Sequence, residues 1–256
     1  MKIEAIRTRV LKPPKDDLLE VLAGYLPPLE ENSVVVISSK VVAIWQGRCE
    51  KMPEGSSDDV RLVKDALARE ESEAHLERDM RYKYSRLWTV YEGVLTGRAG
   101  IDESNGEGYF ILLPKDAKKA AQDIRAYLRE QRGVEALGII ITDSRSVPMR
   151  NGTLGVALGH AGMSALYDYR GRKDIFGRML EFERMNVVDS LATAANLVIG
   201  EGDENTPLAV CTDIPHAVFT DDEASDPLLH AEVTMDEDLF AQFLAPHEWQ
   251  KKSKGK

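Results

Sequence analysis

Carboxylate and hydroxyl side chains directly follow two of the most apolar segments of the sequence. Residues 138–142 read GIIIT and are followed by Asp143 and Ser144, and residues 34–37 read VVVI and are followed by Ser38-Ser39-Lys40. Groups at the end of a buried strand are held rigidly, and their oxygens suit a hard divalent cation. Hydroxyl and ammonium groups also bond phosphate oxygens. The pattern indicates a metal or phosphate site, although Asp143 alone could equally cap a turn.

Two further acidic groups lie between glycines. Residues 100–106 read GIDESNG and residues 200–206 read GEGDENT. Their carboxylates could ligate divalent cations, but they do not have the spacing of an EF-hand loop. Turns also favour Asp, Asn, Ser and Gly for backbone reasons alone. Taken separately, each group is also compatible with a solvated loop.

Residues 151–162 read NGTLGVALGHAG, which invites comparison with a phosphate-binding loop. The segment lacks the Gly-Lys-Ser/Thr ending of a P-loop and does not match GxGxxG, so we reject both assignments. The alternative is that the glycines allow close packing of one backbone on another. No Ser or Cys lies at a spacing from His160 that would indicate a catalytic triad, so the sequence does not support a hydrolase.

A basic cluster follows in residues 168–178, which read DYRGRKDIFGR. Arginine binds carboxylate and phosphate groups in a bidentate manner, so Arg170, Arg172 and Arg178 are candidates for holding an anionic substrate. The alternative is internal pairing with Asp168 and Asp174.

Apolar patterning indicates the elements that must position these residues. Strands are expected at 34–37, 110–113, 138–142, 208–211 and 217–220, and helices at 58–76, 116–131, 186–199 and 236–243. Asn186 and Gly200 are expected to cap the third helix. Strands and helices mix without strict alternation, which predicts a mixed α/β (α+β) body over residues 1–235. This body is either a single domain or two intimate subdomains, and a helical extension with a basic tail follows it over 236–256.

The composition excludes several function classes. The chain of 256 residues has a net charge of −10, which argues against a nucleic-acid partner. The basic tail, Lys251, Lys252, Lys254 and Lys256, is expected to be a solvated end. No run approaches the ~18 apolar residues of a membrane span, and the amino terminus has no apolar signal core. With only Cys49 and Cys211, we expect a reduced, cytoplasmic protein without a membrane partner.

Several stretches together resemble the coenzyme F420-0:L-glutamate ligase family, whose members add γ-linked glutamates to a deazaflavin precursor. The matching stretches occur in the family's order and cover about residues 7–211; they are 39–42, 46–48, 99–105, 141–144, 148–152, 168–174, 176–178 and 194–201. One such motif would be weak, whereas the ordered set is specific for the family.

The resemblance implies a γ-glutamyl ligase fold, neither P-loop nor Rossmann, in an intertwined homodimer. It also implies a GTP-driven ligase with two Mg²⁺ or Mn²⁺ ions that joins L-glutamate to an anionic acceptor through an acyl phosphate. By position, the metal ligands would be Asp102, Asp143, Ser144 and Glu201. The nucleotide would contact Val10, Leu11, Lys12, Pro13, Ser39, Lys40, Asn105, Gly200, Gly202, Asp203, Glu204, Asn205 and Thr206.

The sequence departs from the family at three places. Ser144 stands where archaeal members carry Thr, which keeps the hydroxyl, and Ile44 stands where a nucleotide-contacting Lys is expected. Residues 69–94 match poorly and are expected to shape the acceptor site. Two alternatives stay open: glutamylation of a folate, and a nucleotide-binding or regulatory protein without ligase activity.

Overall fold

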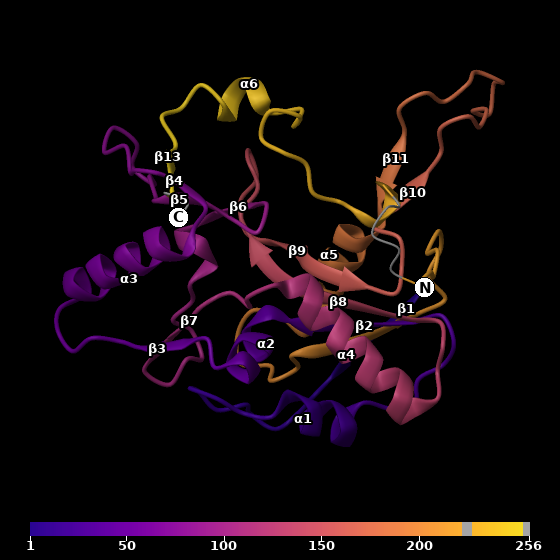
Figure 1. Cartoon of the computed structure of the whole chain (residues 1–256), viewed down its shortest axis with the longest axis horizontal. Helices are drawn as coiled ribbons and strands as arrows, with labels where there is room; N and C mark the ends of the chain where they lie inside the picture. Colours follow the sequence, from indigo (N-terminus) through magenta and orange to yellow (C-terminus); the bar gives the residue numbers. More distant parts are fainter. Residues whose placement is uncertain (222–226, 253–256) are drawn as a thin grey trace. The chain divides into compact units, whose positions relative to one another are not determined.

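The computed structural model describes residues 1–221 and 227–252, and the chain divides into two compact units that interleave along the sequence (Figure 1). Unit 1 consists of residues 1–10, 17–42 and 116–231, and unit 2 of residues 11–16, 43–115 and 232–256. Lys254 and Lys256 of the predicted basic tail lie outside the described residues.

Unit 1 is built on a five-stranded sheet. Its strands, in spatial order, are β1 (Lys2–Ile6), β12 (Leu208–Thr212), β2 (Ser33–Ser38), β8 (Leu137–Arg145) and β9 (Leu154–Ala161). β2 and β8 are parallel, and the other neighbours are antiparallel. Helices cover both faces of the sheet, so β2 is buried almost throughout and has a continuous apolar sequence. β10 (Leu166–Asp168) and β11 (Arg184–Asn186) form a separate antiparallel pair.

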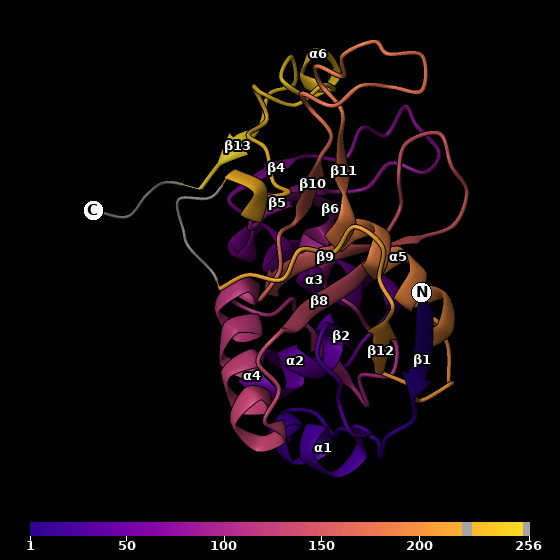
Figure 2. The ribbon, with the colours of Figure 1, turned by 90° about the vertical axis from the view of Figure 1, so that its right-hand side faces the viewer.

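Three capped helices pack in unit 1. α4 (Ala117–Arg132) covers one face of the sheet and α5 (Val187–Ile199) the other, as Figure 2 shows. The side chains of Asp116 and Asn186 accept backbone N–H groups at the starts of α4 and α5. α5 packs on a core that includes Val34, Val36 and Ile140. α1 (Leu18–Tyr25) is capped by Asp17 in the same way. A short 3-10 helix, η2 (Pro227–Leu229), also belongs to unit 1.

Two glycines of β9 let α4 and α5 approach the sheet. A Cβ on Gly155 would lie 2.4 Å from the Ala192 carbonyl oxygen in α5, and one on Gly159 would lie 2.4 Å from the Ala117 carbonyl carbon in α4. The pairing of β9 with β8 shifts register between Ile141 and Thr142. This shift lies between the two glycines of β9, so they face opposite sides of the sheet. The glycine-containing run therefore serves close backbone packing, which was one of its two interpretations.

Unit 2 contains smaller sheets. β13 (Gln250–Lys251), β4 (Ala74–Leu76), β5 (Trp88–Tyr91) and β6 (Val94–Gly97) form one sheet, and β3 (Cys49–Lys51) pairs with β7 (Tyr109–Ile111). α3 (Ser57–Glu71) begins with a capping box of Ser56 and Asp59. Asp65 of α3 forms an ion pair with Arg98 at 2.5 Å, in the 3-10 turn η1 (Arg98–Gly100). The last helix is α6 (Ala241–Leu244), and α2 (Ser39–Gln46) begins in unit 1 and ends in unit 2.

The mixed α/β class is confirmed, as are the helices predicted at 116–131 and 186–199 and four of the five strands. Within the described residues, no helix is both long enough and apolar enough to cross a membrane. The family-specific fold, the domain boundaries and the intertwined dimer stay predictions.

One predicted strand is wrong, and two predicted helices are shorter than expected. The helix over 58–76 ends at Glu71, because residues 74–76 pair with β5 instead. Residues 217–220 form no strand, and only Phe219 makes an isolated bridge, to Met163. The helix over 236–243 is reduced to α6, because Thr234 and Asp238 bond nearby groups and hold turns.

We predict that Gly159→Ala lowers the free energy of unfolding by about 1–3 kcal/mol, because the added methyl group must displace the backbone of α4. Gly24→Ala in α1 is the matched control. No atom lies within 4 Å of the added Cβ there, so the better helix former is expected to stabilise by about 0.5–1 kcal/mol. Urea unfolding of both variants measures the difference, and a Gly159→Ala protein as stable as the parent would contradict the packing described above.

Candidate functional site

Strand register brings several of the predicted residues to one edge of the unit 1 sheet. Ile6, Leu208, Ile37 and Ile141 are aligned across β1, β12, β2 and β8. β1, β2 and β8 run toward this edge, and β12 begins there. The residues that follow this row therefore emerge side by side: Ser38-Ser39, Thr142-Asp143 and the loop that leads into β12.

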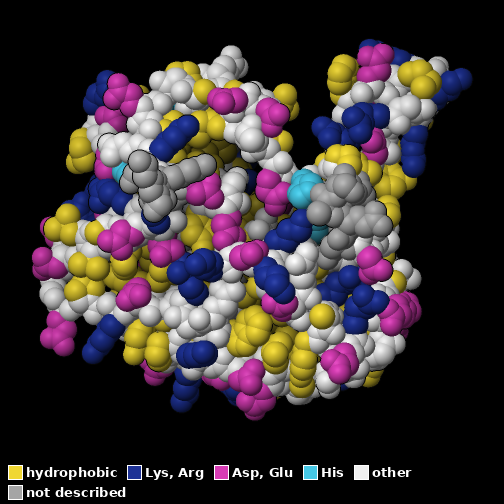
Figure 3. All heavy atoms as spheres, in the orientation of Figure 1, with side chains coloured by type: hydrophobic (Ala, Val, Ile, Leu, Met, Phe, Trp, Pro, Cys, Tyr) yellow, Lys and Arg dark blue, Asp and Glu magenta, His cyan; other side chains and the backbone are white. Residues whose placement is uncertain are grey.

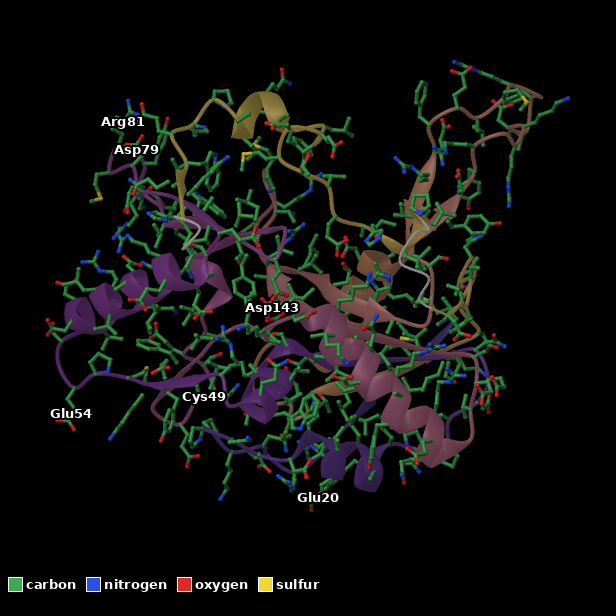
Figure 4. The ribbon with its side chains drawn as sticks, viewed as in Figure 1. Glu20, Cys49, Glu54, Asp79, Arg81 and Asp143 are labelled. Carbon is green, nitrogen blue, oxygen red and sulfur yellow. The ribbon has the colours of Figure 1, made fainter. Side chains whose placement is uncertain are left out.

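Ser39 and Asp143 are hydrogen-bonded at this edge. The Ser39 Oγ donates to Asp143 Oδ1 at 2.6 Å, and Ser39 is only 3% exposed. Asp143, labelled in Figure 4, lies one residue beyond the last parallel pair, Ser38 with Thr142. β2 has ended there and α2 begins with Ser39, so the carboxylate meets the amino end of a helix, which favours negative charge.

The strand does not end at Thr142 as the sequence suggested. β8 continues to Arg145 because Asp143, Ser144 and Arg145 pair with β9. Thr142 donates from Oγ1 to the Val156 carbonyl and to Asn196 Oδ1, both at 3.2 Å. Asn196 of α5 is a residue near the site that sequence reasoning missed, because no local pattern marks it.

The loop 200–206 is tied to the residues that follow β1. The Asn205 side chain donates to the Thr8 carbonyl at 2.7 Å, and the Thr8 N–H donates to the Asn205 carbonyl at 3.2 Å. Glu204 accepts the Gly202 N–H at 2.8 Å, and Thr206 bonds back to the Ile199 carbonyl. The loop is a hydrogen-bonded structure that leaves Glu201 and Asp203 exposed.

Gly200 is required at the start of this loop. Its φ is +81°, and a Cβ there would lie 2.3 Å from the Glu204 carboxyl carbon. The residue that follows the loop is bonded to β2, since the Ser38 N–H donates to the Pro207 carbonyl at 2.9 Å. In unit 1, the register thus gathers Ser39, Lys40, Asp143 and Ser144 with the loop 200–206 at one edge, and Val10 follows Thr8 by two residues.

Asp102 belongs to unit 2 and holds its own turn. Its Oδ1 accepts the N–H groups of Glu103 and Ser104 at 2.6 and 2.9 Å, and its Oδ2 accepts the Ser104 hydroxyl at 2.8 Å. The backbone of Asp102 exchanges two hydrogen bonds with Ile111. Asn105 follows with a φ of +54°. The turn-forming interpretation of this segment is therefore correct, and it is compatible with a role in binding.

The predicted site residues are divided between the two units. Leu11, Lys12, Pro13, Asp102 and Asn105 belong to unit 2, and the remaining predicted residues belong to unit 1. Among residues 1–221 and 227–252, no three His, Cys, Asp or Glu side chains are grouped so that they could hold a metal ion. The four-residue metal site stays a prediction.

The predicted arginines lie on an arm that continues from β10 and β11 (Figure 1). Arg170 bonds both carboxylate oxygens of Asp168, and these hydrogen bonds lower the pKa of Asp168 to about 2. Arg172 stacks over the rings of Tyr167 and Tyr169, at 4.9 and 5.7 Å from their centroids. The alternative of internal pairing is therefore correct for Arg170, which is paired with Asp168. Asp174 instead accepts the backbone N–H groups of Phe176 and Arg178.

Exposed apolar side chains at the tip of this arm were missed. Ile175, Phe176 and Phe182 are 92%, 90% and 83% exposed. Hydrophobic and basic side chains lie together on the arm in Figure 3. Residues 174–182 read DIFGRMLEF, and this alternation of apolar and charged residues is the sequence pattern that could have indicated the exposed apolar side chains.

The motif residues Gln46 and Arg48 have structural partners in unit 2. The Gln46 amide exchanges hydrogen bonds with the backbone of Lys115, at 3.0 and 2.8 Å. Arg48 forms an ion pair with Glu71 and donates from Nε to the Leu113 carbonyl at 3.1 Å. Ile44 is 2% exposed, so an apolar side chain suits the position where a Lys was expected.

We predict that the Ser39–Asp143 bond couples the two residues energetically. In a double-mutant cycle of Ser39→Ala and Asp143→Ala, urea unfolding should give a coupling of about 1.5–3 kcal/mol, the value for a hydrogen bond to a charged group. Ser39→Ala combined with Asp123→Ala, a change on exposed α4 surface, should be additive to within about 0.5 kcal/mol. Additivity in the Ser39–Asp143 cycle would show that the bond is not formed in solution.

Comparison with known proteins places these features in one family. The family model described as F420-0:Gamma-glutamyl ligase matches residues 5–213. The chain is 35% identical over 223 residues to the coenzyme F420:L-glutamate ligase of Methanopyrus kandleri, covering 82% of this chain and 86% of the relative. It is 37% identical to the protein of the same description from Haloarcula marismortui, over 84% of this chain and 87% of the relative. The chain therefore belongs to the F420-0:γ-glutamyl ligase family, whose members are ligases that form carbon–nitrogen bonds.

Proposed function

We propose that this protein is a cytoplasmic, GTP-driven γ-glutamyl ligase that joins L-glutamate to the carboxylate of an F420-0-like acceptor. The observation that carries the proposal is the extent of the family match. Residues 5–213 include Asp102, Asp143, Ser144 and Glu201, and they span parts of both units. The curated relatives are described as coenzyme F420:L-glutamate ligases.

The proposed reaction has two steps. A carboxylate and an amine do not condense in water, so the acceptor carboxylate first takes the γ-phosphoryl group of GTP, giving an acyl phosphate and GDP. The glutamate amine then attacks the acyl carbon, the amide bond forms, and phosphate leaves with its bonding electrons. The amine loses one proton in this step.

The donor set fits Mg²⁺ or Mn²⁺. Asp102, Asp143, Ser144 and Glu201 offer only oxygen atoms, as hard divalent cations prefer, and two ions are proposed. When bound, the metals would neutralise the triphosphate and the charge that develops during phosphoryl transfer. Such ions are commonly held by one or two carboxylates together with substrate phosphates.

The residues at the unit 1 edge are suited to the nucleotide. Ser39 and Lys40 stand at the amino end of α2, where backbone N–H groups and the helix dipole favour phosphate. The family resemblance also assigns nucleotide contacts to the loop 200–206 and to Val10, Leu11, Lys12, Pro13 and Asn105. We propose Arg178, of the three arginines, as the residue that binds the anionic acceptor or glutamate, since Arg172 is stacked on Tyr167 and Tyr169. In the described part of the chain the Arg178 side chain has no ion-pair partner, whereas Arg170 is already paired.

We predict that Asp143→Asn abolishes glutamylation while the fold is kept, because the neutral amide lacks the negative charge that a carboxylate brings to a divalent cation. The protein is incubated with F420-0, L-glutamate, GTP or ATP, and Mg²⁺ or Mn²⁺, and mass spectrometry detects an added glutamyl unit. Asp123→Asn, on exposed α4 surface, should keep full activity.

Three outcomes decide among the functions considered. Full activity in Asp143→Asn would remove this residue from the site. A mass gain on a folate but not on F420-0 would support the folate alternative. If no acceptor gains mass and the nucleotide is not cleaved, the ligase proposal is refuted and a nucleotide-binding or regulatory protein is supported.

We also propose a homodimer formed through the arm. Its exposed Ile175, Phe176 and Phe182 would be covered by a second copy, and large exposed apolar patches are typical of interfaces. The double substitution Phe176→Asp with Phe182→Asp should give a monomeric mass in light scattering, because burying two unpaired charges is costly. Leu62→Asp, at a 61% exposed position on α3, is the control and should stay dimeric. A monomeric parent protein would overturn this proposal.

A further inference from the structure

The connection between β4 and β5 in unit 2 exposes an unusual combination of side chains. Residues 77–87 read ERDMRYKYSRL, and we call them the tyrosine loop. Tyr82 and Tyr84 are 67% and 80% exposed, and Met80 is 80% exposed. The loop contains four cations in a chain with a net charge of −10. It lies within 69–94, the segment that fits the family pattern poorly.

The tyrosine loop is held by its own hydrogen bonds. The Asp79 N–H donates to Ser85 Oγ at 2.8 Å, and the N–H groups of Tyr82 and Ser85 donate to the carbonyls of Asp79 and Tyr82, both at 3.1 Å. Arg81 bonds both carboxylate oxygens of Asp79, and Figure 4 shows these two labelled residues together. The two tyrosines are thus presented on a folded turn.

Both acidic residues of the loop are already neutralised. Glu77 is paired with Arg69 at 2.7 Å, and Asp79 with Arg81 at 2.6 Å. Within the described part of the chain, Arg78, Lys83 and Arg86 have no carboxylate partner. Lys83 lies 5.1 Å from the centroid of the Tyr84 ring. The loop therefore presents two aromatic faces beside cations that are not paired with acids.

This combination recognises a particular class of ligand. Exposed aromatic rings stack on flat ring systems, and adjacent Lys and Arg side chains attract anionic groups. L-glutamate has no ring to stack. The acceptor of the proposed reaction has both features, a flat deazaflavin ring and negative charge. The nucleotide shares them, but its phosphates already have a proposed site at the unit 1 edge.

We propose that the tyrosine loop binds the acceptor: the ring system stacks on Tyr82 and Tyr84, and Lys83 and Arg86 hold its anionic group. The inference rests on the proposed function for the identity of the ligand. These four residues are binding residues that set acceptor affinity, and the chemistry of amide formation belongs to other parts of the chain.

Binding is measured first, without turnover, by equilibrium dialysis of F420-0 against the full-length protein. The double variant Tyr82→Ala with Tyr84→Ala should weaken F420-0 binding by about tenfold or more, the scale of lost stacking on aromatic side chains. Tyr82→Phe with Tyr84→Phe keeps both rings and should bind as the parent does. The double variant Lys83→Ala with Arg86→Ala should also bind F420-0 more weakly than the parent. Because salt screens charges, the difference in F420-0 affinity between this variant and the parent should become smaller as salt is added.

Matched controls and a second ligand make the test specific. Tyr25→Ala removes a tyrosine that is 42% exposed on α1, and Lys51→Ala removes an exposed lysine of β3; both should bind F420-0 as the parent does. GTP affinity, measured in the same way, should be unchanged in the tyrosine-loop variants. In the ligase assay, the KM for F420-0 should rise in the alanine variants while the KM for GTP and for glutamate does not.

The outcomes separate this inference from the proposed function. If the parent binds no F420-0, or the alanine variants bind it as tightly as the parent, the tyrosine loop is not the acceptor site, whatever the ligase assay gives. If only GTP affinity falls, the loop serves the nucleotide and the proposal is overturned. If F420-0 binding falls as expected but no glutamate is ever added, the loop assignment stands and the ligase proposal fails.

Discussion

The parallel pairing of β2 with β8 is the constraint on which the candidate site depends. Parallel strands end at the same edge of a sheet, and here the last pair joins Ser38 to Thr142. β2 stops at that point and becomes α2, whereas β8 continues beside β9. The Asp143 carboxylate is therefore left next to the first turn of a helix, and the Ser39 hydroxyl bonds it at 2.6 Å. A one-residue slip of this pair would turn Asp143 to the other face.

Close packing on both faces of the sheet keeps this register in place. β2 and β8 are buried between α4 and α5, so a slip would also move apolar side chains out of the core. The glycines of β9 contribute because they allow each helix to approach the sheet backbone. The register shift between Gly155 and Gly159 is needed for this, since residues four apart in a regular strand face the same side. Glycines that resembled a phosphate loop are thus part of the scaffold that positions Asp143.

Local signals in the sequence were sufficient where local interactions decide the structure. The caps Asn186 and Gly200 and the buried strands β2, β8 and β12 could be identified, because capping and burial leave marks within a few residues. Tertiary pairing could not be seen in the same way: residues 74–76 extend a helical pattern but join β5. The Ser39–Asp143 bond spans 104 positions and depends on strand order, so each residue was a candidate while their contact was not predictable. The family resemblance supplied the nucleotide and the metals, which no spacing in the chain specifies.

The two acidic centres show why a structural role and a binding role need not exclude each other. Asp102 holds its turn through the N–H groups of Glu103 and Ser104, and Asp143 is fixed by the hydroxyl of Ser39. Hydrogen bonds of this kind orient a carboxylate before any ligand arrives, and such outer partners tune the affinity of metal-binding groups. A freely rotating carboxylate would lose rotamer entropy on binding, whereas these two have already lost it during folding. The interactions that make Asp102 look like an ordinary turn residue are therefore the same ones that would make it an effective ligand.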